Sequence, residues 1–366
     1  MSQESRRFLK KILLFLSPFI IYFSIESCVL PVNFFNFRVW EALRVYTFAA
    51  FLPGPFYPHQ HLVSVEEGDL GHGTAWATRT ATEWWTDEFG YRNKPGGQAP
   101  QVVVVGDSFT AGSGLTQTDT LPSQLGERLH QNVYNFAPAD MNIFLNEKRF
   151  ILHPPRIVVL AVLERNLTAM PLWVETPPPA SFGDYFARWA RGVTSLQPLW
   201  VTLDRFQKMP GLHYLNARLF DIDPYALASV PAGPLLFFPY DLDQADLTDV
   251  QISKMANLLI LYRDTLRQRG IGFVFLPIPT KESVYYLLRQ DGREPKTVPR
   301  LVRALQDRNM KCVDLQKTFI EASRKTKKFL YRKDDTHWNV AGVRIAASLL
   351  ADQIQNRPEF KTPPSP

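Results

Sequence analysis

The sequence predicts an α/β fold of three layers, in which helices cover both faces of a mostly parallel sheet. Short apolar runs rich in β-branched residues, at 101–105, 133–136, 156–163 and 271–276, alternate with segments of helical period. These runs lack polar alternation, which is typical of strands buried on both faces. A predicted N-terminal membrane anchor and an insertion in the alternating pattern complete the architecture.

The first 35 residues combine a basic tip with an apolar segment. The basic residues are Arg6, Arg7, Lys10 and Lys11. The apolar run 12–25, extended to residue 30, comprises 19 residues, close to the ~20 that cross a bilayer. No small-x-small motif follows, which favours an uncleaved anchor over a cleaved signal peptide or a lipid-modified Cys28. The basic flank predicts a cytoplasmic tip (residues 1–11), with everything after about residue 35 outside.

Three further segments follow the anchor. Residues 36–98, rich in Pro, Gly and aromatics without sustained period, are expected to form an extended lead-in. The main domain is expected at 99–356, interrupted at about 178–245 by an insertion or cap with many prolines and aromatics. Residues 357–366 should form a loose tail.

Within the main domain, helical spacing of apolar residues predicts four helices. They lie at 120–130, 252–269, 299–308 and 339–354. Gly270 follows the second of these as a fitting C-terminal stop. A further strand is predicted at 311–315.

Composition restricts the partners. The net charge of +6, from 41 Lys+Arg and 35 Asp+Glu, is spread along the chain, which allows a membrane surface or acidic glycan but does not indicate nucleic acid. The two cysteines, Cys28 and Cys312, form no disulfide framework or CxxC motif. His59 and His61 lack further ligands nearby and are interpreted as loop histidines. We therefore expect neither a metal nor an organic cofactor.

The segment 103–114, VVVGDSFTAGSG, carries the first chemical motif. A buried strand leads into Gly106-Asp107-Ser108, followed by small residues and then a helix. This order places the Ser108 hydroxyl at the carboxyl edge of a parallel sheet, where ligands of open α/β folds bind. Backbone amides there could stabilise an oxyanion. By itself the motif is also compatible with a plain turn, because Gly, Asp and Ser all favour turns.

The second motif is the segment 331–342, YRKDDTHWNVAG. A serine alcohol needs a base within hydrogen-bond reach, and a further group must orient that base. Of the seven histidines, His337 is the one preceded by two acids, Asp334 and Asp335. The alternative interpretation of His337 is that it caps a helix or belongs to the core. We predict that His337 lies within hydrogen-bond reach of Ser108, and either acid could orient it.

Together the two motifs resemble the SGNH (GDSL-like) hydrolase superfamily, over about residues 101–354. That superfamily begins with a Gly-Asp-Ser strand-turn and ends with Asp-x-x-His or Asp-x-His, in the chain order seen here. The resemblance implies a flavodoxin-like three-layer domain with Ser108 as nucleophile and His337 as base. It also implies an oxyanion site formed by the amides of Ser108 and Ala137 and the side chain of Asn166. Ala137 replaces the superfamily's glycine, and Asn166 could instead cap a helix.

Three segments resemble more narrowly the alginate O-acetyltransferase-like branch of that superfamily: 164–166 (ERN), 279–285 (PTKESVY) and 335–339 (DTHWN). This resemblance implies transfer of acetyl groups to exopolysaccharide hydroxyls in the periplasm. The acyl donor would come from a membrane-bound O-acyltransferase, and the chain would be single-pass in the inner membrane with its N-terminus cytoplasmic.

The two resemblances differ over the acid that orients His337. The branch selects Asp335, whereas the wider superfamily selects Asp334. With Asp335 as partner, the Asp334 side chain is expected to point to solvent or to Lys333. Lys281, Glu282 and Tyr285 also match the branch. From the residues alone, they are interpreted as a helix N-terminus with one outward ion pair and are not counted as catalytic.

Two other functions remain open. An esterase would use the same residues with water as acceptor in place of a sugar. A non-catalytic glycan-binding scaffold would present the aromatic-rich residues 51–91 and 178–245. Ser108, His337 and Asp335 together argue against a scaffold, which has no use for the set, but they do not separate a transferase from an esterase. The resemblance to the acetyltransferase branch favours the O-acyltransferase.

Overall fold

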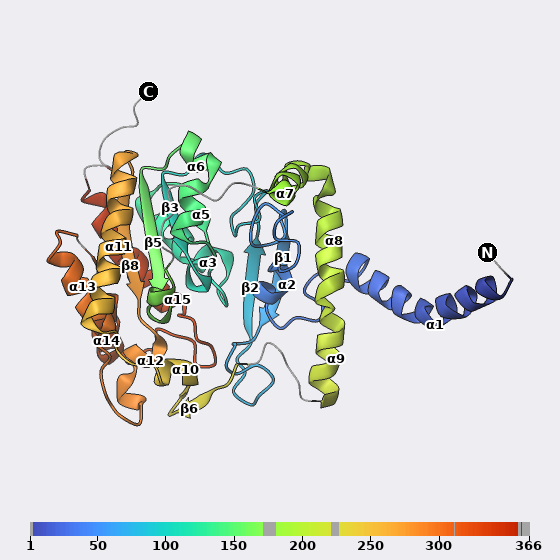
Figure 1. Cartoon of the computed structure of the whole chain (residues 1–366). Helices are drawn as coiled ribbons and strands as arrows, with labels where there is room; N and C mark the ends of the chain where they lie inside the picture. The colour runs from blue at the N-terminus through green and yellow to red at the C-terminus, as the bar shows by residue number, and fades with distance from the viewer. Residues whose placement is uncertain (1–2, 171–180, 221–226, 311, 358–359, 361–366) are drawn as a thin grey trace. The chain divides into compact units, whose positions relative to one another are not determined.

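The computed structural model describes residues 3–170, 181–220, 227–310, 312–357 and 360. The chain forms two compact units. We call Met1–Pro58 with Pro179–Tyr225 the helical unit, and His59–Pro178 with Ala226–Pro366 the sheet unit. Figure 1 shows the elements of each.

A four-stranded parallel sheet is the centre of the sheet unit. Its strands, in spatial order, are β4 (Val133–Phe136), β3 (Val102–Gly106), β5 (Ile157–Leu163) and β8 (Gly272–Ile278). Val105 pairs with Phe136, and Gly106 pairs with Ala161. Because the strands are parallel, the carboxyl ends of β3, β4 and β5 meet at one edge, where the segments of all three predicted oxyanion residues begin.

Helices cover both faces of this sheet. Val102 and Val104 of β3 point into one buried cluster, whereas Val103 and Val105 point into the other. The first cluster includes side chains of α4 (Leu121–Leu129), α14 (Leu315–Thr326) and α15 (Val340–Gln355). The second includes side chains of α5 (Met141–Asn146), α6 (Lys148–Leu152), α11 (Asp249–Gln268) and α13 (Thr297–Gln306). The predicted three-layer α/β fold with a parallel sheet is confirmed.

Short elements complete the sheet unit. They are the antiparallel pairs β1 (His61–Glu66) with β2 (Thr80–Trp85) and β6 (Val230–Ala232) with β7 (Leu235–Phe237), and the helices α3 (Ser108–Ala111), α10 (Pro239–Leu242) and α12 (Lys281–Val284). Four 3₁₀ turns are Gln117–Asp119, Glu164–Ala169, Tyr286–Leu288 and, in the helical unit, Thr194–Leu196.

The structure bears on two local predictions. The lead-in was expected to be an extended segment, and it contains the β1–β2 pair and a short helix, α2 (Val39–Leu43). The strand predicted at 311–315 is wrong for the residues described: 312–314 form no strand, and Leu315 begins α14, whose N-cap is Asp314. Cys312 lies beside β8, with its thiol 3.6 Å from the Phe275 carbonyl oxygen, but without ladder hydrogen bonds its apolar neighbours remain a loop.

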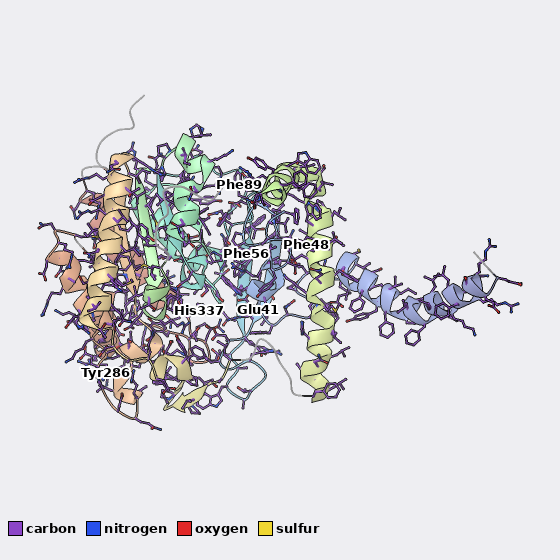
Figure 2. The ribbon with its side chains drawn as sticks, in the orientation of Figure 1. Glu41, Phe48, Phe56, Phe89, Tyr286 and His337 are labelled. Carbon is purple, nitrogen blue, oxygen red and sulfur yellow. The ribbon has the colours of Figure 1, made fainter. Side chains whose placement is uncertain are left out.

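The helical unit contains α1 (Gln3–Cys28), α2, α7 (Phe182–Gly192), α8 (Gln197–Lys208) and α9 (Pro210–Phe220). The buried Asp204 carboxylate organises its interior, since it accepts hydrogen bonds from the amides of Thr47 and Phe48 and from the Tyr57 hydroxyl. The Phe48 ring, labelled in Figure 2, stacks on Trp200 at 5.8 Å. These contacts tie the start of the chain to α8.

Helix α1 contains the predicted apolar segment. It has 26 residues, and no residue of its most apolar stretch is buried. By length and composition this helix could cross a bilayer, and a signal sequence would meet the same criteria.

Candidate active site

Ser108 lies where the first motif predicts, directly after β3 and at the first position of α3. It is partly exposed, whereas the neighbouring Phe109 is buried. As the first residue of the helix, Ser108 has no acceptor for its N–H within α3. Both the hydroxyl and the amide of Ser108 thus stand at the carboxyl edge of the sheet.

His337 reaches Ser108 from a distant part of the chain. Its Nε2 atom lies 2.8 Å from the Ser108 hydroxyl oxygen, across 229 positions of sequence. The imidazole is buried, and its ring centre lies 4.6 Å from that of Phe109. The predicted hydrogen-bond proximity is therefore present in the structure, and it brings together two segments that neither motif alone could place.

Asp335 contacts the other side of the imidazole. Its Oδ1 atom lies 2.7 Å from Nδ1 of His337 and also accepts the backbone N–H of that residue at 2.8 Å. An acceptor at Nδ1 favours the tautomer with a proton there, which leaves the Nε2 lone pair directed at Ser108. Of the two acids that the sequence left open, Asp335 is the one in contact with the imidazole.

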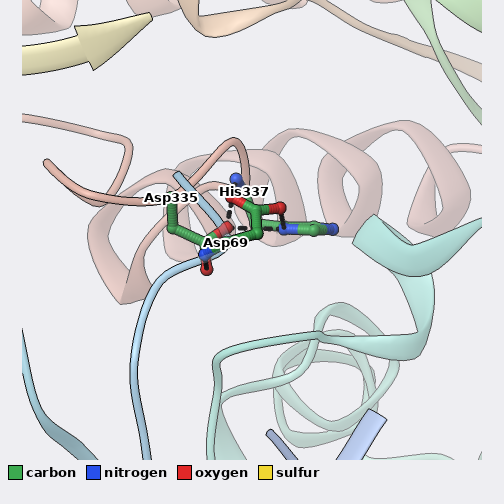
Figure 3. Close-up of side chains that lie close together, drawn as sticks. All are labelled: Asp69, Asp335 and His337. Atoms are coloured by element: carbon green, nitrogen blue, oxygen red, sulfur yellow. Dashed lines mark hydrogen bonds and ion pairs between the residues drawn. The ribbon is translucent and has the colours of Figure 1, made fainter. Parts of the chain in front are cut away.

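A second carboxylate, Asp69, was missed by the sequence analysis. Figure 3 shows it beside Asp335 and His337, approaching from the lead-in segment. Asp69 is buried and accepts hydrogen bonds from the amide and hydroxyl of Thr336, both at 2.7 Å. Its Oδ2 atom lies 3.5 Å from Nδ1 of His337. Its partners lie about 267 positions away, so no local pattern connected it to the histidine.

Two glycines let the lead-in approach this closely. A Cβ atom at Gly68 would lie 2.1 Å from the Asp334 carbonyl oxygen, and one at Gly71 would lie 2.7 Å from the Asp334 side chain. The spacing Gly68-Asp69-Leu70-Gly71 was the only sequence signal of this contact, and it could equally indicate an exposed turn.

Asp334 does not point to solvent or to Lys333, as had been expected. It is buried, and its Oδ2 atom accepts the backbone N–H groups of Gly68 at 3.2 Å and Thr78 at 2.6 Å. Its own carbonyl oxygen accepts two more N–H groups, from Leu70 and Gly71. The lead-in loop thus covers Asp334, whose role in these contacts is to hold two loops together.

Asp107 joins the Ser108 turn to the end of β5. Its carboxylate accepts the N–H of Phe109, the N–H of Leu163 and the side-chain amide of Asn166, at 3.0, 3.3 and 3.0 Å. Asn166 therefore lies next to the residue preceding Ser108, in the 3₁₀ turn after β5. An Asn amide group has two N–H donors, of which this contact uses one.

Ala137, the remaining residue predicted for the oxyanion site, directly follows β4 and is buried. Its neighbour Ala139 donates its N–H to the carbonyl oxygen of Gly106 at 2.8 Å. Ala137 thus belongs to the same carboxyl edge as Ser108, on the adjacent strand.

The loop from 331 to 339 is held as a narrow hairpin. Tyr331 and Trp338 form an antiparallel bridge, and both side chains are buried. Asn339 caps α15 through the amides of Ala341 and Gly342. The Arg332 guanidinium donates to the Gly114 carbonyl oxygen at 3.2 Å, which ties this loop to the end of the first motif.

Lys281 and Glu282 do not form the expected outward ion pair, because both are buried. The Lys281 ammonium donates to the Leu236 carbonyl oxygen at 2.8 Å, and it contacts that of Lys333 at 3.5 Å. Burial lowers the pKa of Lys281, and the carboxylates of Glu282, Asp335, Asp69 and Asp334 oppose that shift. This ammonium group therefore contacts the histidine loop, residues 331–339, at the Lys333 carbonyl oxygen.

The donor set Asp69, Asp335 and His337 has the residue types of a metal site, with ligand atoms within 4.8 Å of one another. Two ligands of a tetrahedral zinc ion would lie roughly 3.3 Å apart, given bonds of about 2.0 Å. The 2.7 Å between Asp335 Oδ1 and His337 Nδ1 is instead the length of a charge-assisted hydrogen bond. The geometry fits a proton shared between acid and imidazole better than a metal between them.

Comparison with known proteins identifies the C-terminal part of the chain. Residues 236–365 match the family model described as the SGNH hydrolase-like domain of the acetyltransferase AlgX. No curated protein matches the chain. The match confirms the predicted resemblance to the alginate O-acetyltransferase-like branch and indicates an enzyme of the acyltransferase or esterase type. It includes His337 and both acids, whereas Ser108, Ala137 and Asn166 precede it.

Glu282 generates a prediction about pH. Burial, together with the neighbouring Asp241 carboxylate, raises its pKa from 4.5 to about 7. The folded chain therefore holds an extra proton between those values, and the free energy of unfolding should fall as pH rises from about 4.5 to 7, by at most ~3 kcal/mol.

The Glu282→Gln side chain does not ionise in this range, so the decrease in the free energy of unfolding with rising pH should be absent in the variant. Urea unfolding of the detergent-solubilised wild type and variant at pH 5, 6 and 7.5 measures it. Parallel pH profiles for the two proteins would contradict the assignment.

Proposed function

We propose that this chain is an extracytoplasmic O-acyltransferase, an O-acetyltransferase by preference, that acylates polysaccharide hydroxyls through a covalent intermediate on Ser108. The observation that carries this proposal is the continuous hydrogen-bonded series from Ser108 through His337 to Asp335. The match of residues 236–365 to the domain of an acetyltransferase supports the reaction class.

Formation of the acyl-enzyme begins at Nε2 of His337. This atom accepts the Ser108 proton as the hydroxyl oxygen attacks the acyl carbonyl carbon. The protonated imidazole then donates that proton to the leaving group of the donor. Asp335 stabilises the imidazolium and keeps Nδ1 protonated, and Asp69 fixes Thr336 between these two residues. In the second half, His337 takes the proton of the acceptor hydroxyl, whose oxygen attacks the acyl carbon. The protonated imidazole then returns this proton to the Ser108 oxygen as the bond between that oxygen and the acyl carbon breaks.

The oxyanion formed in each half-reaction needs donors on the side of the carbonyl facing away from His337. The N–H groups of Ser108 and Ala137 and the second N–H of Asn166 are the candidates. Asp107 positions Asn166 by holding its other N–H at 3.0 Å. Removal of one such donor typically lowers the rate by ~10²–10³.

The acceptor separates this proposal from its alternatives. An esterase would run the same first half and use water in the second, so the triad geometry does not distinguish the two. A glycan-binding scaffold would not need a serine 2.8 Å from a buried imidazole. We infer a polysaccharide acceptor and an acyl donor delivered by a membrane-bound O-acyltransferase from the branch that the chain resembles.

We expect Asp335→Asn to slow acyl-enzyme formation by ~10³–10⁴, because the imidazole would adopt the wrong tautomer and the imidazolium would lose its counter-charge. The measurement is the burst of chromophore released from an acetyl ester. Asp334→Asn is the matched control. It should leave the burst rate within about tenfold and lower the free energy of unfolding by ~1 kcal/mol, because an amide oxygen replaces the carboxylate at two N–H groups. The reverse pattern of activity would assign the orienting role to Asp334.

Transfer is tested by adding oligosaccharides, alginate oligosaccharides among them, to the same ester assay. We expect acetylated oligosaccharide by mass spectrometry, formed by the wild type and absent with Ser108→Ala. Release of acetate alone at saturating acceptor would identify an esterase. A wild-type chain with no burst and no product would leave only the scaffold.

Topology requires a separate test, because the triad says nothing about location. With α1 as a single-pass inner-membrane anchor and a cytoplasmic tip, alkaline phosphatase fused after residue 40 should be active, since that reporter folds only outside the cytoplasm. An inactive but stably expressed fusion would place the enzyme inside and remove the exopolysaccharide acceptor.

A further inference from the structure

Helix α7 presents its large apolar side chains outward. Phe182, Tyr185, Phe186 and Trp189 are 87, 62, 44 and 59% exposed, whereas Ala187 and Ala190 are buried. The four aromatics lie at spacings of three and four residues and therefore share one face of the helix. A surface helix in water normally buries such a face and exposes the other. We call these four residues the aromatic stripe.

Helices α8 and α9 repeat this pattern. Gly211 is the one buried residue of α9, while Leu212, Leu215 and Leu219 are 43, 46 and 69% exposed at helical spacing. On α8, Leu199 and Phe206 are exposed and lie seven positions apart on one face. We call these five side chains the leucine face. Exposed apolar groups gathered over several helices mark an interaction surface.

The leucine face continues directly into α1. The ring of Phe206 packs against that of Phe23 in α1, with centroids 5.4 Å apart. The Gly211 N–H donates to the Glu26 carboxylate at 2.9 Å, and the Arg205 guanidinium donates to the carbonyl oxygens of Glu26 and Leu30. The end of α1 is thus fastened where α8 meets α9. In Figure 1, α8 and α9 follow one another nearly end to end, and α1 extends away from their side.

If α1 crosses a bilayer, its contacts with α8 and α9 place these two helices at the membrane surface. Glu26 lies in the last turn of α1, which ends at Cys28, so Glu26 and its partners lie at the end of the span, at the level of the lipid headgroups. Helices that leave this point sideways run along the membrane surface. Residues 181–220 contain five Lys+Arg and two Asp+Glu, a net charge of +3 that suits anionic headgroups.

We propose that the leucine face and the aromatic stripe form a membrane-interface surface, which seats the helical unit in the headgroup region of a phospholipid bilayer. Helices that lie in a membrane interface typically carry aromatic and leucine side chains on one face and arginines beside it. Their apolar side lies ~5–10 Å deep, at the boundary between headgroups and acyl chains. This inference rests on the anchoring proposed for α1, and it goes further because α7, α8 and α9 bind lipid themselves.

Nitroxide labels on single cysteines test the surface in the full-length chain. The background carries Cys28→Ser and Cys312→Ala, and the protein is reconstituted alone into vesicles of phosphatidylcholine and phosphatidylglycerol. Labels are placed by Phe186→Cys on the stripe, Leu215→Cys on the leucine face and Ile20→Cys in α1. Val63→Cys and Leu287→Cys are matched controls, because these apolar residues are 71 and 67% exposed in the sheet unit.

We expect labels at 20, 186 and 215 to collide more often with oxygen, which concentrates in lipid, than with a nickel chelate, which stays in water. The order should reverse at 63 and 287. Aqueous accessibility at 186 or 215, with the label at 20 in lipid, would overturn the interface surface and leave the anchor intact. A label at 20 that is also aqueous would overturn both.

Discussion

Two loops, one from each end of the sheet unit, are locked together by three buried carboxylates. Asp69 belongs to the lead-in, and Asp334 and Asp335 belong to the histidine loop. Each carboxylate accepts backbone N–H groups of the opposite loop or of its own, which offsets the cost of removing three negative charges from water. The absence of side chains at Gly68 and Gly71 permits this contact. The position of the His337 imidazole depends on this contact between the two loops, because the contact fixes the loop that carries the imidazole.

Ser108 is held in place by an independent set of contacts. Asp107 ties the turn before Ser108 to Leu163, the last residue of β5, and to Asn166 in the 3₁₀ turn that follows. Arg332 connects this set to the histidine loop through the Gly114 carbonyl oxygen. Gly114 has a φ of 73°, and a Cβ atom there would lie 2.6 Å from the Arg332 guanidinium. A glycine is therefore required at the point where the two halves of the site meet.

Helices α7, α8 and α9 expose large apolar side chains of the kind that the sheet unit buries. The sheet unit follows the ordinary rule for a protein in water, with β5 and β8 buried along their whole length. In the helical unit, Ala187, Ala190 and Gly211 are buried, whereas leucines and aromatics of the same helices are exposed. A bilayer interface would remove that conflict, because it supplies an apolar phase outside the protein.

The local sequence by itself determined the four strands of the parallel sheet, four of the helices that cover it, and the proximity of Ser108 to His337. Strands buried on both faces need continuous apolar runs, and a serine nucleophile needs a base, so each left a readable signal. The tertiary structure alone decided which carboxylates surround the imidazole. Asp69 carries no local mark of its function, because its partners lie at the other end of the chain. It also decided that Lys281, Glu282 and Asp334 are buried and that the apolar faces of α7–α9 point outward. Periodicity shows which residues share a face, but only the packing of neighbouring elements decides which face meets solvent.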